Sequence, residues 1–174
     1  MIKVIGTKNH SPLSWAIRWL TKTDCSHLAI VFDDKFVIQA NLLGVGMDYF
    51  PTFSKKQIIV HSVEIGTTLE GEDRIWSDLL DLCGGKDYDV KALIYDGWRY
   101  ALKRFFKIPL PKKNKWSSPN KYLCTRMVLV LDIYLKEHFE YLSYGLAGIG
   151  DIDMMEPSTI ISLIASHTAN RGRL

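Results

Sequence analysis

The chain has 174 residues, a formal net charge of +3, 47% hydrophobic residues and 24% charged residues. These proportions are typical of a folded globular protein and exclude a disordered chain as the default, while the small net charge singles out no class of partner. The length predicts a single domain over residues 1–174, with residues 169–174 as a frayed tail.

The sequence gives no sign of export or of membrane insertion. Residues 1–6 lack a basic segment, an apolar segment of signal-peptide length and a small-residue cleavage site. No apolar run approaches the roughly 18 residues of a spanning helix. Cys25, Cys83 and Cys124 are too few and too scattered for a disulfide framework or a C-x-x-C zinc site. We therefore expect a cytoplasmic protein with reduced thiols, no metal and no cofactor.

The first third of the chain predicts a strand, a helix and a hairpin. Residues 1–7 have the composition of a strand, and residues 11–20 that of a helix with Pro12 in its first turn. The buried stripe expected for this helix consists of Leu13, Ala16, Ile17 and Leu20. Residues 25–32 and 36–40 are rich in strand formers and flank a polar turn at 33–35, which predicts a hairpin.

The hairpin brings a histidine and an amide to one sheet face. Alternation places His27 with Ala29 and Val31, and a short turn sets it nearly opposite Gln39, residue 40 or residue 41. Taken singly, His27 is more often an edge-strand polar residue and Gln39 a solvated one.

The middle of the chain predicts a loop or irregular strand at 42–53, a strand at 57–64 and helices at 69–83 and 89–106. The first helix is expected to turn Ile75, Trp76, Leu79 and Leu82 inward and to turn its acidic residues, Glu70, Glu72, Asp73, Asp78 and Asp81, mostly outward. The apolar stripe of the second consists of Val90, Leu93, Ile94, Gly97, Ala101 and Phe105. The basic and aromatic stretch at 103–116 is interpreted as a solvated loop, because no nucleic-acid motif accompanies it.

Residues 120–134 predict a buried central helix, apolar on both faces, with Pro119 and Asn120 as start signals. Cys124 then lies in the first turn, where the helix dipole favours a thiolate. A cysteine on an apolar face is more often a packing residue, so catalysis requires a base from elsewhere. A glycine-rich loop at 145–150 and a helix at 155–164, with Pro157 in its first turn, complete the chain.

Five segments in this order, at residues 26–31, 37–40, 85–89, 122–128 and 156–160, resemble the circularly permuted branch of the NlpC/P60 superfamily of papain-like cysteine hydrolases. The resemblance implies an α+β fold in which an antiparallel sheet packs against the helix carrying the cysteine. It implies Cys124 as nucleophile, His27 as base and Gln39 as the group that orients the imidazole. Two departures stand out: Thr125 and Arg126 follow the cysteine where Ser and Glu are common, and Gln39 often has a glutamate counterpart.

The resemblance favours a cysteine peptidase or amidase acting on peptidoglycan peptides, reached by cell lysis, a phage particle or a secretion system. One alternative is a lipid or thioester acyl hydrolase or transferase, supported by the basic stretch at 103–116. Another is a non-catalytic structural part of a larger assembly such as a virion. Metal binding through Cys25, His27 and Cys83 is a further alternative that their spacing does not recommend. No specific nucleic acid is expected as a partner.

Overall fold

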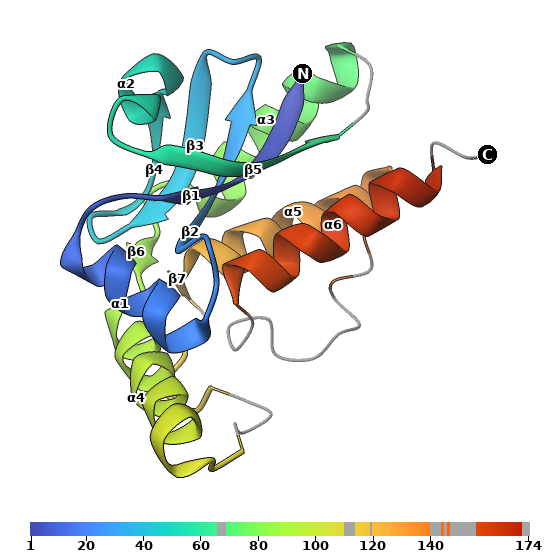
Figure 1. Cartoon of the computed structure of the whole chain (residues 1–174). Coiled ribbons are helices and arrows are strands. Elements are labelled where there is room, and N and C mark those ends of the chain that lie inside the picture. The colour runs from blue at the N-terminus through green and yellow to red at the C-terminus, as the bar shows by residue number, and fades with distance from the viewer. Residues whose placement is uncertain are drawn as a thin grey trace.

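The computed structural model describes residues 1–65, 69–109, 114–118, 120–139, 144, 146 and 156–171. The fold is α+β, with a five-stranded antiparallel sheet in the order β4-β3-β2-β1-β5 (Figure 1). The strands of this sheet are β1 Ile2–Lys8, β2 His27–Phe32, β3 Phe36–Asn41, β4 Gly44–Tyr49 and β5 Ile58–Ile65. A separate parallel pair joins β6, Asp87–Tyr88, to β7, Lys121–Tyr122.

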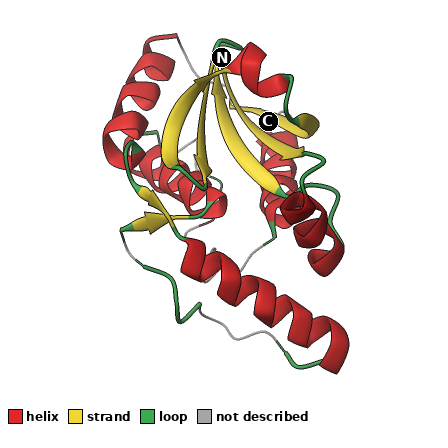
Figure 2. Ribbon diagram, turned by 90° about the vertical axis from the view of Figure 1, so that its left-hand side faces the viewer, coloured by secondary structure: helices red, strands yellow, loops and turns green. Residues whose placement is uncertain are grey.

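The helices are α1 Pro12–Thr21, α2 Phe50–Ser54, α3 Leu69–Cys83, α4 Val90–Phe106, α5 Cys124–His138 and α6 Pro157–Arg171. Figure 1 shows α5 and α6 side by side against the sheet and α1 with α4 beyond one end of it, and in Figure 2 the long helix α4 is clear of the sheet. No helix in the described ranges is long and apolar enough to cross a membrane.

Strand alternation divides the buried side chains between the two faces of the sheet. Leu28 and Ile30 of β2 belong to a large core with side chains of α3, α5 and α6. Ala29 and Val31 belong to a smaller core closed by Phe53 of α2. Because both faces are covered, β2 is apolar at every position from 28 to 31, whereas a strand with one solvated face would alternate.

The predicted hairpin is confirmed, with Ala29 opposite Gln39 in the register. Its turn places Asp33 and Asp34 at φ 50° and 52°. Aspartate tolerates this left-handed conformation better than most residues, and two such residues in succession suit a tight hairpin. The predicted strands at 1–7 and 57–64 also form, as β1 and β5.

The central helix begins later than its predicted start signals. It starts at Cys124, and residues 121 and 122 instead form β7. Met127, Val128, Leu131 and Leu135 are buried as expected, but Ile133 is 37% exposed. Asp132 is fully buried and its carboxylate accepts hydrogen bonds from the backbone N–H groups of Tyr144 and Leu146.

Two other predicted helices form over their expected ranges, but their buried stripes were partly wrong. In α4 the buried side chains are Ala92, Asp96 and Tyr100, whereas Ile94 and Phe105 are 58% and 61% exposed. In α1 Leu13 is 43% exposed. These two helices pack on each other beyond the end of the sheet, so no sheet face covers their apolar stripes.

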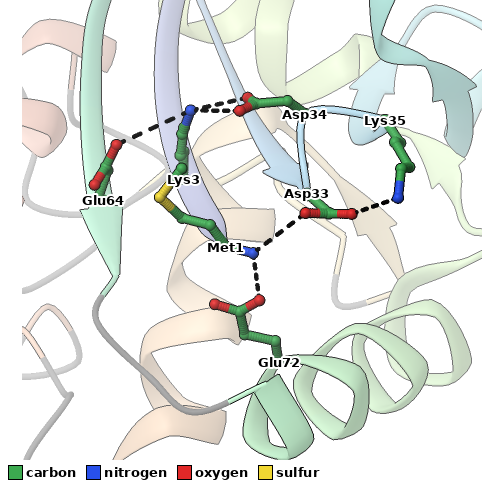
Figure 3. A network of polar contacts seen from close by, with 7 residues as sticks. All are labelled: Met1, Lys3, Asp33, Asp34, Lys35, Glu64 and Glu72. Carbon is green, nitrogen blue, oxygen red and sulfur yellow. Dashed lines mark hydrogen bonds and ion pairs between the residues drawn. The ribbon is translucent and has the colours of Figure 1, made fainter.

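In α3 Ile75 and Leu79 are buried as predicted, whereas Leu82 is 48% exposed. The prediction that Glu72 faces outward was also wrong, since this side chain is buried. Its carboxylate pairs with the amino group of Met1 at the end of β1 (Figure 3). In the same network Lys3 binds Asp34 at 2.8 Å and so ties β1 to the hairpin turn.

Three further predictions need revision. The region at 42–53, interpreted as a loop or irregular strand, contains β4 and the start of α2, with Pro51 inside that helix. Residues 103–106 of the basic stretch belong to α4, while 110–113 lie outside the described residues. The last helix runs to Arg171, so the predicted frayed tail begins as helix, and 172–174 lie outside the described residues, as does most of the glycine-rich loop at 145–150.

Candidate functional site

His27, Gln39 and Asp48 form a chain of hydrogen bonds across three adjacent strands. The His27 Nε2 lies 3.1 Å from the Gln39 Oε1, and the Gln39 Nε2 donates to the Asp48 Oδ2 at 2.5 Å. An ionised carboxylate only accepts, so Asp48 fixes the amide with its oxygen toward the histidine. The imidazole then carries its proton on Nε2, which leaves Nδ1 as the basic nitrogen.

The environment of His27 keeps the imidazole neutral. Burial lowers the pKa of His27 from its ordinary value to about 4, and the hydrogen bond that His27 donates to Gln39 opposes only part of this effect. A neutral imidazole at neutral pH can accept a proton from a thiol, which is the first requirement of a general base.

Cys124 occupies the first position of α5. Leu123 precedes it as a cap residue that supplies no side-chain hydrogen bond. The backbone N–H groups of a first helical turn have no partners within the helix, so this position favours a thiolate or another anion. The Cys124 side chain is buried, with 7% of the residue exposed.

The other two cysteines lie in surroundings that suppress thiolate formation. Burial raises the pKa of Cys25 to about 12, assisted by the Asp24 carboxylate, and raises the pKa of Cys83 to about 11. Both side chains are fully buried. They are therefore expected to be inert, and they serve as internal references for the reactivity of Cys124.

Cys124 lies in the wall of a largely apolar cavity of about 140 Å³. The cavity is lined from α1 by Leu13, Ala16, Ile17, Leu20 and Thr21, and from α4 by Leu93, Asp96, Gly97 and Tyr100. Thr125, next to the cysteine, also lines it, and its buried hydroxyl finds no hydrogen-bond partner among the described residues. An unsatisfied buried hydroxyl is costly, so this atom is available to a polar group of a ligand.

His27 and Gln39 line a second, more polar hollow of about 200 Å³. This hollow and the Cys124 cavity share Leu13, Ile17, Ser26 and Tyr88 in their walls. The structure thus brings His27 and Gln39 into contact, and it places Cys124 in the adjoining cavity rather than in theirs.

Strand alternation accounts for this division. His27 follows the face of Ala29 and Val31, whereas Cys124 packs in the core that contains Leu28 and Ile30. His27 is the first residue of β2, and Ser26 just before it reaches the Cys124 cavity. The imidazole and the thiol therefore lie near the same end of β2, in neighbouring hollows separated by the wall that contains Ser26.

Two polar residues of this region were missed in the sequence. Asp48 was missed because residues 42–53 lack regular alternation, so the pairing of β4 with β3 was not predicted. Thr125 was noted only as a departure from the family pattern. The Thr125 side chain is buried at the second position of α5. The predicted start signals lie several residues before Cys124, so the sequence did not indicate where this helix begins.

One group of described residues has the side-chain types and proximity of metal ligands. The ligand atoms of Asp24, Cys25 and His61 lie within 4.8 Å of one another, and the His61 Nε2 is 2.7 Å from the Asp24 Oδ2. The alternative set considered from the sequence, Cys25 with His27 and Cys83, does not form such a group among the described residues.

Comparisons of the chain with protein-family models, with curated proteins and with solved structures find no match.

Proposed function

We propose that the protein is a cysteine hydrolase of permuted papain-like fold, with Cys124 as nucleophile, His27 as general base and Gln39 as positioning residue. The observation that carries the proposal is the His27–Gln39–Asp48 chain, which fixes one imidazole tautomer in the hollow that adjoins the Cys124 cavity. A histidine with no role in proton transfer would not require a fixed tautomer. Here the amide that fixes the tautomer is itself oriented by a carboxylate.

The Asp48 carboxylate holds the Gln39 amide in the orientation that points its oxygen at His27. An amide holds the tautomer but does not stabilise an imidazolium as a carboxylate does. Here the Asp48 carboxylate contacts the amide, and burial still lowers the pKa of His27 to about 4. In this proposal the imidazole is neutral at rest, and it takes the thiol proton as the substrate is attacked.

In the proposed reaction His27 Nδ1 takes the thiol proton while the Cys124 sulfur attacks a carbonyl carbon. Backbone N–H groups in the first turn of α5 hold the oxyanion. The intermediate collapses to a thioester and expels an amine, which receives the proton from His27. Water, deprotonated by His27, then releases the carboxylic acid and restores the thiol. These steps require the sulfur and the imidazole to meet at the Ser26 wall that both hollows share.

Peptidoglycan peptides are the substrate class that the family resemblance favours. Their polar amides suit the hollow lined by Asn9, Gln39 and Gln57. Delivery to the cell wall by lysis, by a phage particle or by a secretion system belongs to the same proposal.

A lipid or thioester acyl hydrolase is the second candidate, and a specific observation favours it. The cavity beside Cys124 is apolar, and its α1 side carries Leu13, Ile17 and Leu20. Such a wall suits a hydrocarbon chain better than a peptide. The two candidates share the nucleophile, the base and the thioester intermediate, and they differ in the group that occupies this cavity.

The test is alkylation by iodoacetamide at neutral pH, with each modified cysteine identified by mass spectrometry. Cys124 is expected to react at least about tenfold faster than Cys25 and Cys83, because a positioned base contributes at least that much. His27→Ala should remove this advantage, whereas His61→Ala, which changes a histidine near Cys25, should leave it intact.

Equal and slow reaction of all three cysteines would overturn the proposal. Fast labelling of Cys124 that persists in His27→Ala would overturn the assigned base and leave a reactive thiol activated by the helix alone. Either result would favour a non-catalytic binding or structural domain on the same fold.

A further inference from the structure

The solvent-facing surface of α1 and α4 carries an unusual concentration of exposed aromatic residues. Trp15 is 59% exposed and Trp19 40% on α1, while Ile94, Trp98 and Phe105 on α4 are 58%, 60% and 61% exposed. We call these five residues the Trp face. Exposed aromatic residues gathered on one surface of a soluble domain usually mark an interaction site.

The two helices contribute to one continuous surface. The rings of Trp15 and Trp19 stack with centroids 5.8 Å apart, and the ring of Phe105 lies 5.7 Å from that of Trp19. Arg104 joins the helices further, since its guanidinium lies 4.3 Å from the Trp19 ring centre and donates to the Trp19 carbonyl at 2.7 Å. The rings of Trp15, Trp19 and Phe105 are thus held in place, which lowers the entropy lost when a partner binds.

Every exposed charge on these helices is positive. Lys91 precedes Ile94 and Trp98 by three and seven residues on α4, and Lys22 caps the end of α1 three residues after Trp19, so each lysine lies close to the Trp face. The only carboxylate within α1 or α4 is Asp96, which is buried and accepts from Asn114. A partner with negative charge and an apolar interior therefore fits this surface.

We propose that the Trp face docks on the surface of an anionic lipid bilayer. Tryptophan and phenylalanine partition to the boundary between headgroups and acyl chains, while lysine and arginine bind anionic headgroups. A nucleic acid would match the positive charge but would leave the isoleucine and stacked rings without an apolar partner. The same two helices line the apolar cavity beside Cys124, so docking would bring that cavity to the bilayer.

The inference does not rest on the proposed hydrolase activity. The test is sedimentation of the full chain with phosphatidylcholine vesicles containing about a third phosphatidylglycerol, and with phosphatidylcholine alone. Binding is expected with the anionic vesicles at low salt and should weaken as salt rises, because each basic residue near such a surface contributes about fivefold in binding. A Cys124→Ala variant should bind as the native chain does.

Two double variants separate the aromatic and the charged contributions. Trp15→Ala with Trp98→Ala should lower vesicle binding by more than about tenfold, and so should Lys22→Gln with Lys91→Gln. Matched controls lie around α2, remote from the Trp face (Figure 1): Tyr49→Ala, at a residue 56% exposed, and Lys55→Gln with Lys56→Gln should bind as the native chain does.

Absence of binding to anionic vesicles, or equal binding by both double variants and the native chain, would overturn the proposal. Binding to single-stranded RNA in preference to vesicles, lost in the lysine variant alone, would overturn it in favour of a nucleic-acid surface. A native dimer that Trp98→Ala converts to a monomer in sedimentation velocity would show that a second copy covers the Trp face instead.

Discussion

Gln39 orients the imidazole of His27 and so affects which of its nitrogens is basic, while burial has the larger effect on its pKa. Replacing Gln39 by glutamate puts a carboxylate oxygen 3.1 Å from the imidazole and the other beside the Asp48 carboxylate, so this variant is combined with Asp48→Asn, which leaves a single negative charge next to His27. A carboxylate at that distance stabilises the imidazolium, so Gln39→Glu with Asp48→Asn should raise the pKa of His27 from about 4 by at least about one unit. The measurement is the pH dependence of Cys124 alkylation, whose acidic limb should move to higher pH.

Gln39→Leu is the matched control for this change, since it keeps the size of the side chain and removes both hydrogen bonds. It should slow alkylation without moving the acidic limb upward, because no charge has been added. An unchanged acidic limb in Gln39→Glu with Asp48→Asn would contradict the view that His27 is the base.

The lowered pKa of His27 also predicts how stability depends on pH. The unfolded chain binds a proton to this residue below about 6.5, whereas the folded chain resists protonation until about 4. Stability is therefore fully present above about pH 6.5 and falls as the pH drops toward 4, by at most about 3 kcal/mol from this residue. Urea unfolding of the native chain and of His27→Gln, at pH 7.5 and 4.5, measures the difference.

His27→Gln should lose much of this acid sensitivity, whereas His10→Gln, at an exposed residue, should retain it. If the native chain and His27→Gln lost equal stability between the two pH values, the imidazole would have to be more accessible to solvent than its surroundings indicate.

At the level of elements, helical and strand periodicity predicted most of the strands and helices around the five-stranded sheet, although β4 and the start of α5 were missed. The strand from His27, the hairpin turn at Asp33 and the helix ending at Cys83 all follow from local patterns. Alternation also predicted that His27 and Gln39 share a face, and their hydrogen bond confirms it. The function, the enzyme class and the permuted papain-like fold stay predictions.

Hydrophobic periodicity predicted the wrong exposure for helical residues whose surroundings are formed by distant segments of the chain. Phe105 and Ile94 have helical spacing typical of a buried stripe, but α4 extends past the end of the sheet and exposes them. Glu72 has the composition of a solvated helix face, yet the end of β1 brings the amino group of Met1 against it. Such pairings depend on the tertiary arrangement, which no window of local sequence contains.

The Asp132 side chain connects α5 to Tyr144 and Leu146 by hydrogen bonds. One oxygen of its buried carboxylate accepts a hydrogen bond from the Tyr144 backbone N–H. The other oxygen accepts from the Leu146 backbone N–H at 2.7 Å. Asp132→Ala leaves two buried N–H groups without this acceptor, which should lower the free energy of unfolding by about 2–4 kcal/mol.

Urea or thermal unfolding checks this prediction, with Ile133→Ala as the control one residue away. Ile133 is 37% exposed, so its truncation should cost less than about 1 kcal/mol. Comparable losses in the two variants would mean that the Asp132 hydrogen bonds contribute little beyond the packing of α5.

In the whole molecule the five-stranded sheet separates two hydrophobic cores. The candidate site lies near the end of the sheet where β2 begins. The large core fixes α5 and therefore Cys124, while the hairpin fixes His27 through Gln39 and Asp48. Helix α1 completes both hollows, since Leu13 and Ile17 lie in the wall of each. A displacement of α1 would therefore change both hollows at once, without disturbing either core.

Gly97 offers a way to decide which substrate class uses the apolar cavity. It lies in the middle of α4 and lines the cavity, and a Cβ at this position would meet no atom within 4 Å. Gly97→Ala should therefore stabilise the protein by about 0.5–1 kcal/mol, since glycine is a poor residue for a helix interior. Gly97→Leu should fold equally well and fill part of the cavity of about 140 Å³.

If an acyl chain occupies the cavity, Gly97→Leu should reduce hydrolysis of a long-chain acyl thioester at least about tenfold relative to an acetyl thioester, because the lost space is apolar and near Cys124. Gly97→Ala should hydrolyse both as the native chain does. Equal activity of Gly97→Leu on the two thioesters, together with undiminished cleavage of a peptide amide, would contradict an acyl-binding role and leave the polar hollow around Gln39 as the place where substrate binds.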